Sequence, residues 1–213
     1  MIYIESKHRK IERINKQYPN AEILDLTSNS PYKYGQLLSP FYPHGNIPIP
    51  FSPGYTANSV EGIWQGLKVF QSCGIDMNSF KNNNMTGVKR TVRKYGNVLG
   101  HQKGINSNEL LNYIDARLLI YLPSYKWILE NVPKVVEIIE RIKQKSITND
   151  IVFLDYTTNI DIYNIKKPLS HAGLVKLYIE GKYQNDINTP IISQNEIDIE
   201  KLEFVKHEQL KLF

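Results

Sequence analysis

The sequence predicts a helix-rich α+β fold with a small β-sheet, formed as a single domain over residues 1–213. Most segments repeat their apolar residues at helical spacing, whereas only short runs have the pattern of strands. Of the 213 residues 41% are hydrophobic, which is enough for one ample core. No linker-like stretch divides the chain, so one domain is favoured over two.

The chain opens with a predicted helix and a predicted strand. Residues 7–18 place Ile11 and Ile14 on one face of a short surface helix, and residues 21–27 alternate as a half-buried strand. The five prolines between residues 38 and 54 then forbid a helix or a central strand, so we expect an ordered extended loop. Its aromatic side chains either wall a pocket or cover the core. They are Phe41, Tyr42 and Phe51.

Residues 59–70 form the most informative predicted helix, because its polar residues are few and aligned. Glu61, Gln65 and Lys68 stand at spacings of four and seven and share one stripe. A helix this apolar is mostly buried, so its carboxylate and ammonium must be paired, capped or lining a cavity. Two structural alternatives stay open. Asn58 and Glu61 have the spacing of a capping box, and Lys68 can extend to the surface.

A basic helix and a helical scaffold follow. Residues 76–86 form an Asn-rich loop, and residues 88–95 predict a basic helix that ends at Gly96. Pro123 and Pro133 then separate three helices with apolar inner faces. The three ranges are 108–122, 124–131 and 133–145.

The last predicted elements are a strand and a helix. Residues 151–154 are a continuous apolar run that ends in Asp155, which suits a buried strand. After a loop at residues 157–167, Ser170 caps a final helix that Gly181 closes. The remainder of the chain is polar and weakly patterned.

Composition and missing motifs exclude several classes of function. The single cysteine, Cys73, excludes an internal disulfide, and no run of about 20 apolar residues could span a bilayer. Residues 1–13 lack the apolar centre of a signal peptide, so we expect a cytoplasmic protein. The chain has no phosphate loop, GxGxxG, CxxC or HExxH motif, and its histidines lack ligand spacing. We therefore expect no metal site and no cofactor.

The net charge of +5 is concentrated locally between residues 89 and 103, where no acidic residue occurs. This stretch either contacts phosphate groups or a nucleic-acid backbone, or forms a solvated helix face. Its cationic residues and histidine are Lys89, Arg90, Arg93, Lys94, His101 and Lys103.

Three segments together resemble the NADAR (YbiA-like) family. They are Leu38-Ser39-Pro40-Phe41-Tyr42-Pro43, Gly54-Tyr55, and the helix from Ser59-Val60-Glu61 through Gln65 and Lys68 to Phe70. Family members carry a Leu-Ser-Asn-Phe-Tyr-Pro-like loop, a Gly and Tyr, and a helix that opens with Val-Glu and ends Gln-Ala-x-Lys-Phe. Farther on, Asp161 and Tyr163 are similar to the Asp-x-Tyr-Trp-Gly segment of the family, and residues 170–177 to its last helix.

The resemblance covers a core of about residues 38–181. An N-terminal helix-strand extension at 1–37 and a polar C-terminal tail at 182–213 lie outside it. The chain also departs from the family pattern within the core, which makes it a divergent member. Pro40 and Ser170 stand where the family has Asn, and Asn164 stands where it has Trp.

The resemblance implies cleavage of an N-glycosidic bond without a cofactor. Its substrate would be a ribosylated, phosphorylated molecule, either a riboflavin precursor or ADP-ribosylated guanine in nucleic acid. In such a reaction Glu61 would stabilise positive charge at the anomeric carbon or protonate the leaving base. Lys68 could attack that carbon and form a Schiff base. Asp161 is the candidate second acid, with Asp155 as the alternative.

The predicted site therefore combines catalytic and substrate-binding residues. The catalytic candidates are Glu61, Lys68 and Asp161. The substrate-binding candidates are Phe41, Tyr42, Tyr55, Gln65, Arg90, Arg93, Tyr163 and Ser170. Two other functions stay open: a silent module that binds ADP-ribose derivatives, and nucleic-acid binding through residues 89–103. The sequence leaves the oligomeric state open.

Overall fold

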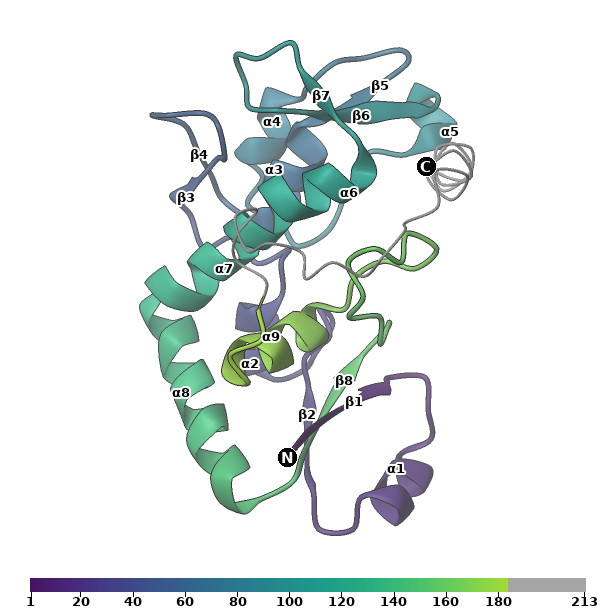
Figure 1. Cartoon of the computed structure of the whole chain (residues 1–213), viewed down its shortest axis with the longest axis vertical. Helices are drawn as coiled ribbons and strands as arrows, with labels where there is room; N and C mark the ends of the chain where they lie inside the picture. The colour runs from purple at the N-terminus through teal and green to yellow at the C-terminus, as the bar shows by residue number, and fades with distance from the viewer. Residues whose placement is uncertain (184–213) are drawn as a thin grey trace, which may run out of the picture.

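A parallel sheet forms one end of the molecule in the computed structural model, which describes residues 1–183 (Figure 1). Its strands are β1 (Ile2–Ser6), β2 (Glu22–Asp25) and β8 (Ile151–Asp155), in the order β1-β8-β2. β8 is buried along its whole length because it lies between the other two strands. Val152 and Leu154 pack with Ile14 of α1 (Ile11–Gln17), while Ile151 and Phe153 face the main core.

The chain was predicted to open with a helix, but the strand β1 comes before the first helix, α1. Ile2, Tyr3 and Ile4 are residue types that favour strands, and β1 gains its partner β8 from the other end of the domain. Ile2 pairs with Ile151, and the register continues to Ser6 opposite Asp155. The predicted strand at residues 21–27 is confirmed as β2.

α9 (His171–Ile179) packs against β1 and β8. The Ser170 hydroxyl accepts a hydrogen bond from the backbone N–H of Gly173 at 3.0 Å, so Ser170 is the N-cap, as predicted. Gly181 ends the turn after α9 with a φ of 68°, a conformation that favours glycine. From residue 184 onward, the predicted polar tail lies outside the described residues.

The proline-rich segment is an irregular loop with one short hairpin, close to its prediction. β3 (Ile47–Pro48) pairs antiparallel with β4 (Thr56–Ala57). Before this loop lies α2 (Lys33–Leu38), a helix that the sequence analysis missed. A Cβ atom on Gly35 would lie 2.3 Å from the carbonyl oxygen of Asp25, so α2 reaches its position only with glycine there.

The predicted helix at residues 59–70 is shorter than expected. α3 (Val60–Gly66) ends at Gly66, and the chain continues as β5 (Lys68–Phe70). Lys68 therefore lies on a strand, opposite His101 of β6 (Val98–Gln102), and not on the same helix as Glu61. The Arg90 guanidinium donates hydrogen bonds to the carbonyl oxygens of Gln65 and Lys68. These bonds satisfy carbonyl groups at the end of α3 and hold the turn between α3 and β5.

Short elements complete this part of the molecule. The Asn-rich loop contains α4 (Met77–Phe80), and the basic segment forms only one helical turn, α5 (Val92–Tyr95), before Gly96. β7 (Leu110–Leu111) pairs with β6 and replaces the predicted start of a helix at residue 108.

Residues 113–131 form one continuous helical run, so the predicted break at Pro123 is wrong. α6 (Tyr113–Ala116), a π-helical turn η1 (Arg117–Tyr121) and α7 (Leu122–Asn131) follow without interruption. The π-helical turn before Pro123 already departs from the i→i−4 pattern, so the missing N–H of proline does not end the helix. Pro133 does begin a new helix as predicted, α8 (Pro133–Thr148).

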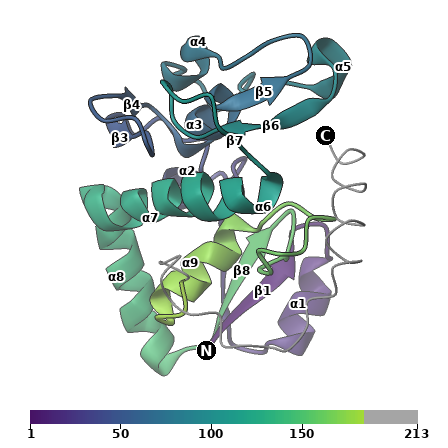
Figure 2. The same cartoon turned by 45° about the horizontal axis from the view of Figure 1, so that its top comes forward.

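α6, η1 and α7 cross between the parallel sheet and the part of the fold that contains α3 to α5 and β3 to β7 (Figure 2). A main apolar cluster includes residues from both parts, from Ile2 and Phe153 to Ile63 and Leu111. These features confirm the predicted helix-rich α+β domain with small sheets. Among residues 1–183, no helix has the length and apolar character needed to cross a membrane.

Candidate functional site

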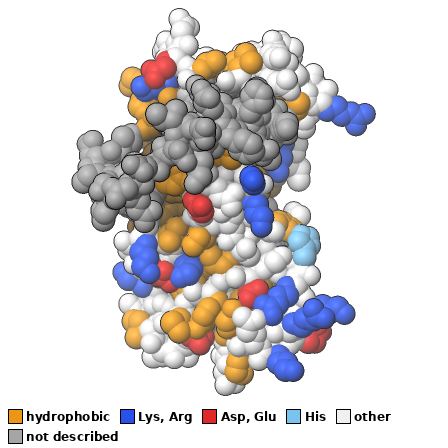
Figure 3. All heavy atoms as spheres, turned by 45° about the vertical axis from the view of Figure 1, so that its right-hand side comes forward, with side chains coloured by type: hydrophobic (Ala, Val, Ile, Leu, Met, Phe, Trp, Pro, Cys, Tyr) orange, Lys and Arg blue, Asp and Glu red, His pale blue; other side chains and the backbone are white. Residues whose placement is uncertain are grey.

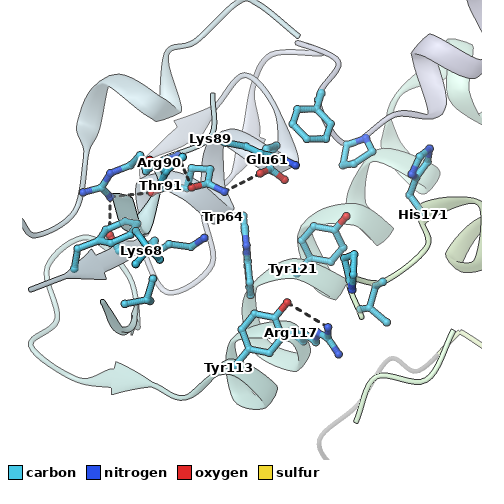
Figure 4. Close-up of a pocket in the computed structure, with 18 residues that line it drawn as sticks. Glu61, Trp64, Lys68, Lys89, Arg90, Thr91, Tyr113, Arg117, Tyr121 and His171 are labelled. Atoms are coloured by element: carbon cyan, nitrogen blue, oxygen red, sulfur yellow. Dashed lines mark hydrogen bonds between the residues drawn. The ribbon is translucent and has the colours of Figure 1, made fainter. Parts of the chain in front are cut away.

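A cavity of about 400 Å³ lies where α3, β5, the segment before α5, the α6-η1 turn and the loop before α9 meet (Figure 4). We call it the Glu61 pocket. It brings together Phe41, Glu61, Gln65, Lys68 and Arg90 from the predicted site. The remaining lining residues are Pro40, Trp64, Phe70, Lys89, Thr91, Val92, Val98, Tyr113, Arg117, Tyr121, Pro168, Leu169 and His171.

Glu61 enters the pocket from the first turn of α3 and is only 7% exposed. The Gln65 amide donates a hydrogen bond to Glu61 Oε1 at 2.8 Å, and the Arg90 backbone N–H donates to Gln65 Oε1 at 3.0 Å. These two hydrogen bonds fix the orientation of the Gln65 amide and hold the Glu61 carboxyl group in place. Burial raises the pKa of Glu61, although Gln65, Lys68 and Lys89 oppose the rise.

The capping-box alternative for Glu61 is wrong. Ser59 is the N-cap of α3, and its hydroxyl accepts a hydrogen bond from the Gly62 N–H at 3.0 Å. The Asn58 backbone N–H, which a capping-box glutamate would bind, donates to the Phe80 carbonyl instead. The carboxyl group of Glu61 is therefore not used to close the helix end.

Lys68 enters the pocket from β5 and is 9% exposed, so it does not extend to the surface. Burial lowers its pKa from 10.5 to about 8; Glu61 opposes this change, while Arg90 and Lys89 add to it. Within residues 1–183, no carboxylate lies within 4.0 Å of the ammonium. Its Nζ lies 5.9 Å from the centre of the Trp64 ring.

Trp64 forms an aromatic wall of the pocket together with two tyrosines. His101 stacks on Trp64 with 3.8 Å between ring centres, and Tyr113 and Tyr121 meet the indole edge-on. His101 is fully buried, and its ring nitrogens are the buried side-chain atoms without a hydrogen-bond partner in the described part of the chain. Burial holds the pKa of His101 well below its usual value, so it packs as a neutral ring.

Arg90 lines the pocket, but its guanidinium is already bound to the protein. Its nitrogens donate to the carbonyl oxygens of Gln65, Lys68 and Gly74 at 2.6 to 3.0 Å and to Cys73 Sγ at 3.0 Å. The geometry thus makes Arg90 a support for the α3-β5 turn, while its role in binding substrate stays a prediction.

Arg117, which the sequence analysis missed, has the same kind of role on the opposite wall. Its guanidinium donates to the carbonyl oxygens of Ile162, Asn164 and Lys167 at 2.7 to 3.0 Å. These bonds hold the loop before Pro168 against η1. The only signal for it in the sequence was an arginine within an apolar run, between Ala116 and Leu118.

Other predicted site residues lie outside the pocket. Asp161 is exposed, and its Oδ1 accepts a hydrogen bond from the Tyr163 N–H at 2.9 Å, so it shapes its own turn. Tyr163 and Tyr55 are 49% and 40% exposed, the Tyr42 hydroxyl binds Lys33, and Arg93 is exposed on α5. The structure gives none of these residues a place in the lining.

Ser170, Asp155 and His171 are close together without forming a catalytic triad. The Ser170 hydroxyl donates to Asp155 Oδ2 at 2.7 Å, and the His171 Nδ1 lies 3.3 Å from the same oxygen. His171 Nε2 faces the carbonyl oxygen of Leu26 at 2.5 Å, so it cannot take a proton from Ser170. Asp155 and Ser170 therefore fix the start of α9, and only His171 lines the pocket.

The basic stretch at residues 89–103 does not form one continuous surface. His101 is buried and Lys103 pairs with Glu109 at 3.0 Å, whereas Lys89, Arg93 and Lys94 are exposed. Lys and Arg side chains are spread over the face in Figure 3, with acidic side chains among them. The exposed cations of this stretch are thus Lys89, Arg93 and Lys94, and nucleic-acid binding through them stays a prediction.

Comparison with known proteins gives a family but no activity. No curated protein matches the chain. The model of a family of unknown function, DUF6939, matches residues 6–175, from the end of β1 into α9. This range includes all the residues that line the Glu61 pocket. The chain therefore belongs to the family of unknown function DUF6939.

Proposed function

We propose that the protein hydrolyses the N-glycosidic bond of a ribosylated, phosphorylated substrate, such as a riboflavin precursor or ADP-ribosylated guanine. The resemblance to the NADAR family supplies the type of reaction. The observation that carries the proposal is that Glu61 and Lys68 line the same pocket and that the pKa of each is shifted toward the uncharged form. Perturbed acid-base groups that share a cavity are typical of catalytic sites.

The two shifts suit complementary roles. A glutamic acid with a raised pKa keeps a proton that it can give to the leaving base, and a lysine with a pKa of about 8 supplies free amine near neutral pH. Glu61 is the one carboxylate in the lining of the pocket as described. The pair of carboxylates that most glycosidases use is thus not present in this lining, which favours Lys68 as the nucleophile.

The reaction then proceeds in two stages. The bond between the anomeric carbon and the base nitrogen breaks, its electron pair stays with the base, and Glu61 protonates that base. The Lys68 amine forms a bond to the anomeric carbon and loses a proton to the Glu61 carboxylate. The bond between this carbon and the ring oxygen then breaks, Glu61 gives its proton to that oxygen, and the nitrogen lone pair forms a protonated imine. Water hydrolyses the imine, which releases the sugar aldehyde and returns the amine.

The walls of the pocket fit the other parts of such a substrate. The rings of Phe41, Trp64 and Tyr121 offer apolar surface for a planar base. Gln65 binds Oε1 of Glu61 and leaves the second carboxyl oxygen for the substrate. Cationic side chains outnumber the single carboxylate in this lining, which suits an anionic substrate.

A screen of ribosylated nucleotides by mass spectrometry, followed by variants, tests the proposal. Glu61→Gln should lower kcat/KM at least about a hundredfold, since general acid catalysis contributes at least that much, while circular dichroism stays unchanged. Glu137→Gln makes the same chemical change on the exposed face of α8 and should retain full activity. Full activity of Glu61→Gln would remove Glu61 from the mechanism.

Borohydride trapping tests the role of Lys68 separately. Reduction during turnover should attach the sugar to Lys68, which peptide mass mapping locates. Turnover without any adduct on Lys68 would contradict the imine step. If calorimetry shows that ADP-ribose binds and no product forms, the alternative of a silent binding module is favoured. Asn164, which stands where the NADAR motif has tryptophan, also supports that alternative.

A further inference from the structure

The cationic side chains of the Glu61 pocket differ in whether they already bind other groups of the protein. The guanidinium groups of Arg90 and Arg117 are each bound to three carbonyl oxygens. His171 lies between the Leu26 carbonyl and Asp155. A substrate phosphate would have to break these bonds to recruit any of the three side chains. Lys68 is buried beside Glu61 and has the role of nucleophile in the proposed function.

Lys89 is the remaining cation in this lining. Its side chain is exposed, and its Nζ lies 5.7 Å from the centre of the Phe41 ring. No ion pair within residues 1–183 involves Lys89. In Figure 4 the side chain extends toward Glu61 along the edge of the cavity. The ammonium is therefore free to bind an anion at the pocket entrance.

Thr91, two residues after Lys89, adds a hydroxyl to the lining of the same pocket. The backbone at Thr91 is extended, with a φ of −113° and a ψ of 146°. Lys89 and Thr91 both line the pocket, whereas Arg90 between them directs its guanidinium to the α3-β5 turn. Thr91 precedes α5, yet its hydroxyl does not cap that helix.

The surrounding sequence adds no competing negative charge. Between Asp76 and Glu109 the chain contains no acidic residue. The nearest carboxyl group in the lining is that of Glu61, which burial makes easier to protonate. An anion at Lys89 and Thr91 thus meets little repulsion from its own segment.

We propose that Lys89 and Thr91 form the phosphate subsite of the Glu61 pocket, and that this subsite takes the phosphate monoester of a sugar phosphate. One ammonium and one hydroxyl provide donors for a single phosphate group. Arg90 and Arg117 are already bound to carbonyl oxygens, so their guanidinium groups are not available for a second phosphate group. The sugar part of this assignment rests on the proposed function, whereas the phosphate part stands on the free donors alone.

Calorimetric titration of the full chain with ribose 5-phosphate tests the subsite, with ribose and ADP-ribose as comparison ligands at one salt concentration. Lys89→Gln should weaken the binding of ribose 5-phosphate at least about tenfold, because a charge-assisted hydrogen bond is lost. Thr91→Val should weaken it about threefold. Lys94→Gln, the same change on an exposed lysine of α5 outside the pocket, should keep the affinity within about twofold.

The possible results separate this proposal from the glycosidase proposal. Equal affinity of Lys89→Gln and wild type, or equal losses in Lys89→Gln and Lys94→Gln, would overturn the subsite. Tighter binding of ADP-ribose than of ribose 5-phosphate would overturn the monoester assignment. Binding of ribose 5-phosphate that depends on Lys89, without cleavage of any riboside, supports the subsite and contradicts the glycosidase. Cleavage of unphosphorylated ribosides, without binding of ribose 5-phosphate that depends on Lys89, would support the glycosidase and contradict the subsite.

Discussion

Replacing Lys68 by methionine should change how the stability of the protein depends on pH. The ammonium is 9% exposed, and burial lowers its pKa in the folded protein from 10.5 to about 8. Between these two pH values the unfolded chain binds a proton on Lys68 that the folded protein does not. Stability therefore rises with pH across this range, and below pH 8 the full cost of burying the charge is present.

The size of the effect follows from the width of that range. Each pH unit inside it corresponds to about 1.4 kcal/mol in the free energy of unfolding. Between pH 8 and about 9.5, wild type should therefore gain roughly 2 kcal/mol relative to Lys68→Met, which has a side chain of similar length and no charge. At pH 7 the variant should be more stable than wild type, because no charge is buried.

Urea unfolding followed by tryptophan fluorescence measures this difference, since the chain contains two tryptophans. The quantity to plot against pH is the free energy of unfolding of wild type minus that of Lys68→Met, in which other titrating groups cancel. Lys94→Met is the control, because a hydrogen bond with Tyr95 raises the pKa of Lys94 out of the range. A difference that stays constant from pH 7 to pH 9.5 would refute the burial of the Lys68 ammonium.

Three further substitutions, at residues that hold the pocket and its surroundings in place, should change the free energy of unfolding that urea titration measures. Arg117→Met should lower stability by about 3–5 kcal/mol, because three carbonyl acceptors lose a buried partner, and a loss under 1 kcal/mol would contradict this. His101→Phe should raise stability by about 1 kcal/mol, since two unpartnered buried nitrogens disappear; a clear loss would show that they have a partner. Gly35→Ala should cost roughly 1–3 kcal/mol, whereas Gly74→Ala, with open space around it, should not.

Local rules in the sequence predicted much of the chemistry of α3. Glu61 and Gln65 are four residues apart on a buried helix, and they are hydrogen-bonded in the structure. The proline-rich loop, the start of α8 at Pro133 and the Ser170 cap also follow from local backbone preferences. These features depend on neighbours within a few residues, so the sequence pattern contains the necessary information.

The assignment of cations and acids to the pocket did not follow from the sequence. Arg90 and Arg93 have the same charge and lie on the same segment, yet one is bound to carbonyl groups and the other is exposed. Asp161 aligns with a family motif but binds the backbone of its own turn. Which polar partners a side chain meets depends on segments that pack against it, and these are distant in sequence.

Local patterns were enough to predict a helix-rich α+β protein in which Glu61 and Gln65 share a buried helix face. Three other features became visible in the folded molecule: β1 pairs with β8, α3 ends at Gly66, and Lys68 reaches the pocket from a strand. The physical reason is the range of the hydrogen bonds. A helix satisfies its backbone within four residues, whereas strands and helix ends take partners from far along the chain.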